Sequence, residues 1–107
     1  MDMHESDWRV FRRLHSIALE RFSQRALEEL RKAAGCTTNY HDCYRRVYRL
    51  LRDHDKRMAA AFDDPGRSNA VVLLANIIGE GLLTDEELKQ FSDETQARLK
   101  AINELRS

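Results

Sequence analysis

The sequence predicts an all-α protein. We expect a long antiparallel helical hairpin, then a buried apolar helix and one or two short C-terminal helices, assembled as a dimeric helical bundle. Apolar residues recur at three- and four-residue steps over residues 7–34 and 40–62, which is the period of an amphipathic helix. Residues 69–83 are almost entirely apolar. The chain of 107 residues has only 4 Gly and 1 Pro, which argues against a β-rich or disordered chain.

The first helix is predicted to begin at Ser6 or Asp7, where either side chain can cap the first turn. Its apolar stripe consists of Trp8, Phe11, His15, Ala18, Leu19, Phe22, Ala26, Leu30 and Ala33. Gly35 ends the helix, as glycine often does just after the last helical turn. We therefore expect residues 1–6 to form a flexible N-terminal tail and residues 7–107 to form a single helical domain.

A second apolar stripe on the first helix carries the prediction of a dimer. Val10, Leu14 and Ile17 are spaced i, i+4, i+7 and lie on a different face from the first stripe. A helix of this length measures about 40 Å, which is longer than a compact domain of this size requires. A two-fold homodimer packed on these three residues accounts for both features. In the alternative, the chain is a monomer whose C-terminal helices fold back over that face.

The second helix is predicted over residues 40–62, after a short loop at 36–39 that makes the two helices antiparallel. Its apolar stripe consists of Tyr40, Cys43, Val47, Leu50, Leu51, His54, Met58, Ala61 and Phe62. Residues 63–66 read Asp-Asp-Pro-Gly, a composition typical of a turn.

Residues 69–83 are the centre of the predicted architecture. Between Ala70 and Ile78 the only polar side chain is Asn76. A helix that is apolar on every side must be buried on every side, and this one is too short to cross a bilayer, which takes about 20 residues. We therefore expect a core helix that other segments cover on all faces.

The C-terminal region begins with a strong helix signal. Thr84 and Glu87 have the spacing of a capping box, and Leu83 and Leu88 that of a hydrophobic staple. Ser92 resembles another N-cap, so we predict a short helix followed by a final helix over about residues 93–105. One bent helix is the alternative, since the apolar positions keep one helical phase across Ser92.

Composition limits the compartment and the partners. The formal net charge is +0, but the first 67 residues carry a net +3 and the remainder a net −3, so the two halves should attract each other. Neither a hydrophobic leader nor a membrane-spanning run is present, which indicates a cytoplasmic protein without membrane contact. Cys36 and Cys43 are then expected to be free thiols.

The most distinctive polar feature is a row of cations on the second helix, which we call the basic stripe: Arg45, Arg49, Arg52 and Lys56. They lie within about 60° of each other on the helical wheel, opposite the apolar side. Three interpretations stay open. The stripe is a solvated face neutralised by Asp42, Asp53, Asp55 or the acidic C-terminal half; it docks on an acidic protein surface; or it follows nucleic-acid phosphates. No aromatic residue interleaves the stripe, which argues against single-strand binding.

No spacing in the chain matches a known catalytic or metal-binding motif, so we predict no catalytic residue, metal or cofactor. Cys36, His41, Cys43 and His54 do not have a zinc-site spacing. His15 and His54 both lie on apolar stripes and could approach each other across the two long helices. We expect two half-buried histidines bonded to backbone or water; the alternative is a pH-sensitive pair.

These features favour a function in binding. The leading hypothesis is a protein–protein adaptor or regulatory module that uses the two long helices. The alternative is a nucleic-acid-associated regulator that uses the basic stripe, and an enzyme is disfavoured.

Overall fold

The computed structural model describes residues 2–107, and it confirms the all-α prediction: these residues form five helices and no strand. The helices are α1 (Glu5–Ala33), α2 (Tyr40–Phe62), α3 (Ala70–Gly79), α4 (Asp85–Leu88) and α5 (Asp93–Arg106). They pack as a helical bundle in which α1 contacts α2 and α3, and α3 also contacts α2 and α5.

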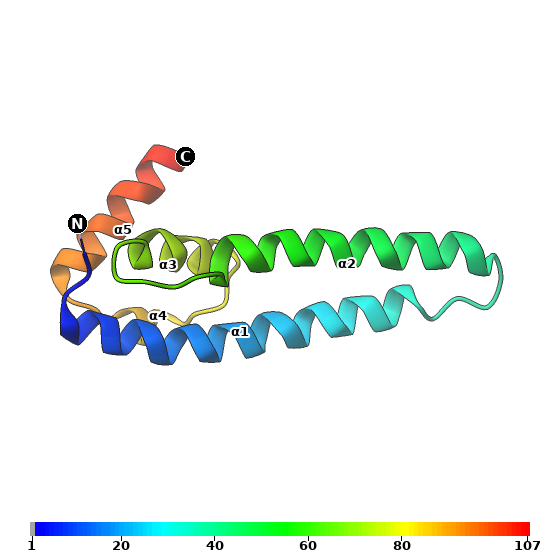
Figure 1. Cartoon of the computed structure of the whole chain (residues 1–107), viewed down its shortest axis with the longest axis horizontal. Coiled ribbons are helices and arrows are strands. Elements are labelled where there is room, and N and C mark those ends of the chain that lie inside the picture. The colour runs from blue at the N-terminus through cyan, green and yellow to red at the C-terminus, as the bar shows by residue number, and fades with distance from the viewer. Residues whose placement is uncertain (1) are drawn as a thin grey trace.

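The molecule is elongated because α1 and α2 extend well past the other helices. They lie side by side in opposite directions, and the loop that joins them is at the far end from both chain termini (Figure 1). The principal extents are 53 × 25 × 23 Å. We call residues 26–54, the distal two-helix part, the arm, and we call the remainder, with α3, α4 and α5, the body.

The core lies in the body and has two adjoining clusters. The larger one joins the start of α1 to α3 and the C-terminal region through Met3, Phe11, Leu14, Ala70, Val71, Leu73, Leu74 and Phe91. The smaller one joins the middle of α1 to the end of α2 through Ala18, Phe22, Ala61, Phe62, Ile77 and Leu82. Neither cluster reaches the arm, so the arm is held mainly by its own two helices.

The N-terminal segment is more ordered than the sequence predicted. Helix α1 begins at Glu5, not at residue 7. The Met3 side chain is only 2% exposed, and its backbone N–H donates to the carbonyl of Arg67 at 3.1 Å. The expected tail over residues 1–6 is therefore incorrect for residues 3–6, because Met3 supplies an apolar anchor. Met1 lies outside the described residues.

The second stripe of α1 is covered within the chain. Leu14 is 2% exposed, and Val10 and Ile17 pack against the same cluster, as do Leu99 and Ile102 of α5. This is the alternative in which the C-terminal helices fold back. Leu14 is therefore closed to a second copy, and Val10 and Ile17 are half-buried within the chain. Their assignment as an oligomer interface stays a prediction.

Helix α3 is central, but it is not covered on every face. Leu73, Leu74 and Ile77 are 7%, 1% and 1% exposed. Ile78 is half-buried, and Val72 is 49% exposed. The neighbours α1, α2 and α5 therefore leave one strip of this apolar helix open to solvent.

The C-terminal region is divided at Ser92, as the cap signals predicted. The Thr84 hydroxyl accepts from the Glu87 N–H at 3.1 Å, and the Glu87 carboxylate accepts from the Thr84 N–H at 2.8 Å, completing the capping box of α4. The Ser92 hydroxyl accepts from the Thr95 N–H to cap α5. The end of α5 then projects from the body (Figure 1).

Candidate interaction surface

The basic stripe lies along the outside of α2. Arg45, Arg49, Arg52 and Lys56 are all exposed. The side of α2 that faces α1 is formed by Cys43, Val47, Leu50 and His54, which are buried or half-buried. Since these apolar positions lie on the opposite side of the helical wheel, the stripe points away from α1. Arg45, Arg49 and Arg52 belong to the arm, and Lys56 follows at its base.

Within residues 2–107, no ion pair joins a cation of the basic stripe to a carboxylate. Asp53, one of the acids that could neutralise the stripe, instead accepts from Arg57 at 2.9 Å. The interpretation of the stripe as a locally neutralised face therefore finds no support in the ion pairs of this chain.

The acidic C-terminal half instead pairs with cations of the body. Arg21 of α1 donates to the Glu87 carboxylate at 2.7 and 3.1 Å, and Arg57 of α2 donates to the Glu80 carboxylate at 3.0 Å. The hydrogen bonds from Arg21 lower the pKa of Glu87 to about 2. The attraction expected between the two halves of the chain is thus realised in the body, away from the basic stripe.

An exposed row of tyrosines borders the basic stripe, and the sequence reasoning missed it. Tyr40, Tyr44 and Tyr48 are 68%, 70% and 52% exposed, and Leu51 is 47% exposed. Their spacing of i, i+4, i+8 and i+11 places them along one edge of α2. The apolar stripe predicted for the second helix includes Tyr40 and Leu51, which are in fact exposed. The four-residue repeat of tyrosine was the signal that would have revealed the row.

A cation–π contact joins the two rows. The Arg52 guanidinium carbon lies 5.8 Å from the centre of the Tyr48 ring, within the range of this interaction. We call the combined surface the basic–tyrosine face: Tyr40, Tyr44, Arg45, Tyr48, Arg49, Leu51, Arg52 and Lys56. Near the start of α2 it adjoins a shallow depression lined by Asn39, Asp42, Arg45, Arg46 and Arg49.

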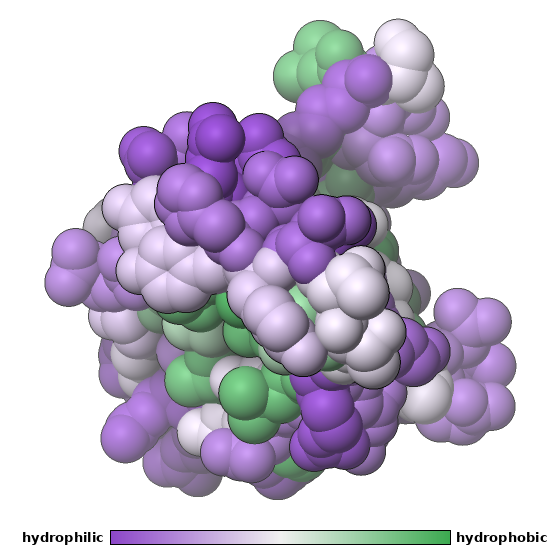
Figure 2. Space-filling model, turned by 90° about the vertical axis from the view of Figure 1, so that its right-hand side faces the viewer, coloured by the Kyte–Doolittle hydropathy of each residue, from purple (hydrophilic) through white to green (hydrophobic). Residues whose placement is uncertain are grey.

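The end of the arm is mainly polar. Figure 2 looks toward this end of the molecule and shows hydrophilic and near-neutral side chains around a smaller group of hydrophobic ones. Buried or half-buried apolar residues between the two helices of the arm are few: Ala26, Leu30, Ala33, Cys43, Val47 and Leu50. With so few buried residues between its two helices, the arm has room for a binding surface on its outside but not for an enclosed site.

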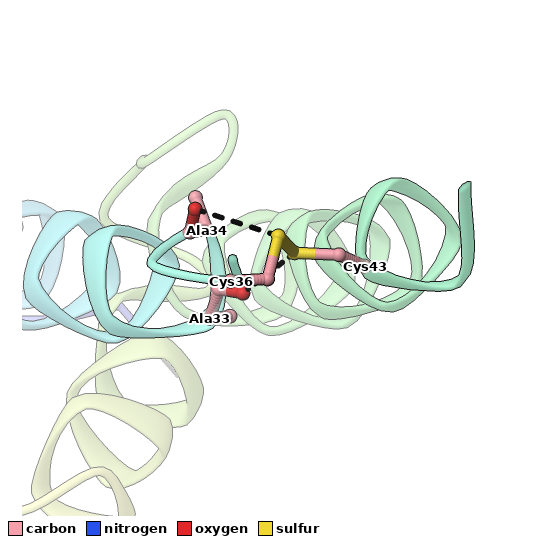
Figure 3. Close-up of a disulfide and its surroundings, with 4 residues drawn as sticks. All are labelled: Ala33, Ala34, Cys36 and Cys43. Atoms are coloured by element: carbon pink, nitrogen blue, oxygen red, sulfur yellow. Dashed lines mark hydrogen bonds between the residues drawn. A yellow bond between two sulfur atoms is a disulfide. The ribbon is translucent and has the colours of Figure 1, made fainter. Parts of the chain in front are cut away.

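Cys36 and Cys43 form a disulfide at the tip of the arm (Figure 3). The expectation of two free thiols is therefore incorrect for this structure. The loop turns back on the start of α2, which brings residues seven positions apart to a Cα–Cα distance of 6.5 Å, within the usual range for a disulfide.

The two histidines do not pair with each other. The His15 ring bonds to the carbonyl of Phe62 through Nε2 at 3.0 Å, and the His54 ring bonds to Glu29 through Nε2 at 2.8 Å. The rings of Phe22 and Phe62 contact each other and lie between them. The alternative of a coupled histidine pair is therefore wrong, because aromatic rings occupy the space that it required.

Two other features are absent from residues 2–107: a cluster of metal-binding side chains and a membrane-spanning helix. No three His, Cys, Asp or Glu side chains there gather in a way that could hold a metal ion. No helix in that range combines the length and apolar character needed to cross a membrane. Comparison of the chain with protein-family models, curated proteins and solved structures yields no match.

Proposed function

We propose that this protein is a binding module whose arm docks, through the basic–tyrosine face, on an acidic surface of a partner protein. One observation carries the proposal: a row of exposed cations without ion pairs runs directly beside a row of exposed tyrosines. Isolated exposed apolar or charged residues are ordinary, but an aligned set of both kinds on one rigid helix is not.

The chemistry of the face suits a protein partner. Tyr and Arg are enriched in protein interfaces and among the residues that dominate binding energy. The cations would steer an acidic partner toward the arm and set its orientation. The tyrosine rings would then lose solvent-exposed area with few rotatable bonds to order.

Binding of a fluorescently labelled poly-L-glutamate at two salt concentrations tests this proposal. We expect the full chain to bind at low salt and to bind more weakly as salt rises. Arg49→Gln with Arg52→Gln should reduce the association rate and keep the unfolding free energy within about 0.5 kcal/mol of wild type. Arg31→Gln with Lys32→Gln is the matched control, because it removes the same charge from the other helix of the arm. Equal loss in both double variants, or no binding at low salt, contradicts the proposal.

A single-stranded nucleic acid is the second candidate partner, and the tyrosine row is the observation that favours it. Bases stack on aromatic side chains in sequence-independent single-strand sites, each worth about 1–3 kcal/mol. In the same assay, an oligo(dT) strand should then bind more tightly than poly-L-glutamate. Tyr44→Ala with Tyr48→Ala should weaken oligo(dT) binding far more than poly-L-glutamate binding.

A homodimer also belongs to this proposal, but at a different surface from the one first expected. Leu14 is buried inside the chain, and Val10 and Ile17 are half-buried. The large apolar side chains exposed on the body are Val72 of α3, at 49%, and Leu105 of α5, at 87%. The body also has a shallow, mainly apolar groove between α3 and α5, whose lining includes Ala75, Ile78, Leu99 and Ile102. A second copy covering this strip would complete the burial that an apolar helix such as α3 requires.

A further inference from the structure

The disulfide is placed where it can control the candidate interaction surface. Cys36 lies in the loop of the arm, and Cys43 lies in the first turn of α2, between Tyr40 and Tyr44 in the sequence and on the side of the helix that faces α1. Cys43 is 3% exposed, and Cys36 is half-buried. The bond therefore ties the loop to the end of the helix that carries the basic–tyrosine face.

Little else holds the start of α2. Asn39, the residue before the helix, makes no side-chain capping bond and has φ of 52°, a left-handed conformation that is uncommon for residues other than glycine. The N–H groups of the first turn therefore lack the side-chain acceptor that usually stabilises a helix start. Asp42 contributes a favourable charge in that turn, but charge effects at helix ends are small.

The same position also accommodates reduced cysteines. The Cys43 sulfur lies 3.1 Å from the carbonyl oxygen of Ala33, and the Cys36 sulfur lies 3.9 Å from that of Ala34 (Figure 3). In a disulfide the sulfurs carry no proton, but a Cys43 thiol would donate to the Ala33 carbonyl, which lies in the last turn of α1. Only the reduced form therefore supplies a donor to the Ala33 carbonyl at Cys43.

We propose that Cys36 and Cys43 form a reversible redox latch on the arm. In the oxidised form the bond fixes the loop and the first turn of α2, so that Tyr40, Tyr44 and Arg45 are held in one arrangement. In the reduced form the first turn frays and this end of the basic–tyrosine face loses its order. Oxidation therefore strengthens binding at that face, a consequence that rests on the proposed function.

A small-molecule disulfide such as glutathione disulfide supplies the oxidising equivalents. The Cys36 thiolate, which is the more accessible, attacks one sulfur and forms a mixed disulfide while one glutathione thiolate leaves. The Cys43 thiolate then attacks the Cys36 sulfur and expels the second glutathione. Two protein thiols and one glutathione disulfide become one protein disulfide and two glutathione molecules. Disulfides in reducing compartments are usually transient or sensing ones, which suits a latch.

Amide hydrogen exchange of the full chain, read by mass spectrometry, tests the latch without a partner. Samples are equilibrated in reduced or oxidised glutathione. We expect exchange over residues 37–44 to be faster in the reduced form, up to roughly 50-fold by the loop-closure entropy of so short a ring. Residues 70–79 serve as the internal reference and should not change. Cys36→Ser should match reduced wild type under both conditions.

Binding of labelled poly-L-glutamate to the same samples separates the latch from the proposed function. Weaker binding after reduction, but not in Cys36→Ser, supports both. A redox-dependent exchange rate with no binding in any sample supports the latch and contradicts the proposed function. Identical exchange in the two buffers, or thiols that stay reduced in glutathione disulfide, overturns the latch, and poly-L-glutamate binding would then support the proposed function alone.

Discussion

A single buried carboxylate attaches the last helix to the first. Asp7 of α1 is 2% exposed, and it accepts from the Ser92 N–H at 2.8 Å, the Ser92 hydroxyl at 2.6 Å and the Thr95 hydroxyl at 2.7 Å. Burial raises the pKa of Asp7, but the hydrogen bonds from Ser92 and Thr95 outweigh it and leave the pKa below its ordinary value. The carboxylate also lies at the positive end of α5, where negative charge is favourable.

Asp7→Asn should therefore destabilise the fold, by about 1–3 kcal/mol. The amide keeps an oxygen for the Ser92 N–H, but it turns an N–H group toward the Ser92 and Thr95 hydroxyls, which must change from donors to acceptors, and the charge-assisted hydrogen bonds are lost. Urea unfolding followed by circular dichroism measures the loss. Asp2→Asn is the control, since Asp2 is exposed and the same charge is removed. Equal midpoints for the two variants would refute the role of Asp7.

The ion pair of Glu87 predicts a pH dependence. Hydrogen bonds from Arg21 and the Thr84 N–H lower the pKa of Glu87 from 4.5 to about 2. Because the folded pKa is below the unfolded one, the unfolded chain binds more protons between these values. The stabilisation is fully present above pH 4.5 and is lost as the pH falls toward about 2. Glu87→Gln should flatten the unfolding free energy over that window, whereas Glu86→Gln, at the neighbouring exposed position, should keep the wild-type slope.

These two sites differ in how far the sequence could reveal them. The two residues of the capping box, Thr84 and Glu87, are three positions apart, so their spacing was sufficient to predict it. Asp7 and Ser92 are 85 positions apart, and no local pattern reports which acid meets which hydroxyl. The disulfide lies between these cases: Cys36 and Cys43 are close in sequence, but the expected compartment argued for thiols.

At the scale of the elements, the two sides of α3 should respond differently to truncation. Leu74 is 1% exposed, whereas Val72 on the same helix is 49% exposed. Leu74→Ala should cost about 2–5 kcal/mol, because it removes buried surface and leaves a cavity. Val72→Ala should cost well under half as much in the monomeric chain. Urea unfolding of both variants at low protein concentration measures the difference, and similar losses would show that the open strip is covered in solution.

The helix assignments were largely accessible from the sequence because period and capping are local. The sequence could not predict which faces of each helix are covered by neighbouring helices. The α2 stripe included Tyr40 and Leu51 because they keep the apolar phase, yet both are exposed. The reason is that the arm is only two helices thick, so residues at the edges of an apolar stripe have no third helix to contact. The tyrosines of the basic–tyrosine face are exposed for this reason. The apolar period of a helix does not indicate how many other helices pack against it.

At the scale of the whole molecule, the exposure of a side chain in the single chain decides whether a charge substitution there can test the proposed homodimer. In a homodimer packed on Val10, Leu14 and Ile17, Leu14→Glu would either separate the two copies or unfold the protein. Since Leu14 is 2% exposed within one chain, the substitution should now unfold the protein, because the charge would be buried without a partner. Substitutions that test assembly must therefore use side chains that a single chain leaves exposed.

The proposed homodimer makes such a test possible. Light scattering of the wild type at micromolar concentration should give twice the chain mass of 12.5 kDa. Val72→Lys with Leu105→Lys should give the mass of one chain with little loss of helix content, because both side chains are exposed in that chain and the added charges would be buried only in the dimer. Leu27→Lys is the control, since Leu27 is 60% exposed but lies on the arm. A wild-type mass of one chain would refute the dimer, and dissociation by Leu27→Lys alone would move the interface from the strip beside α3 to the arm.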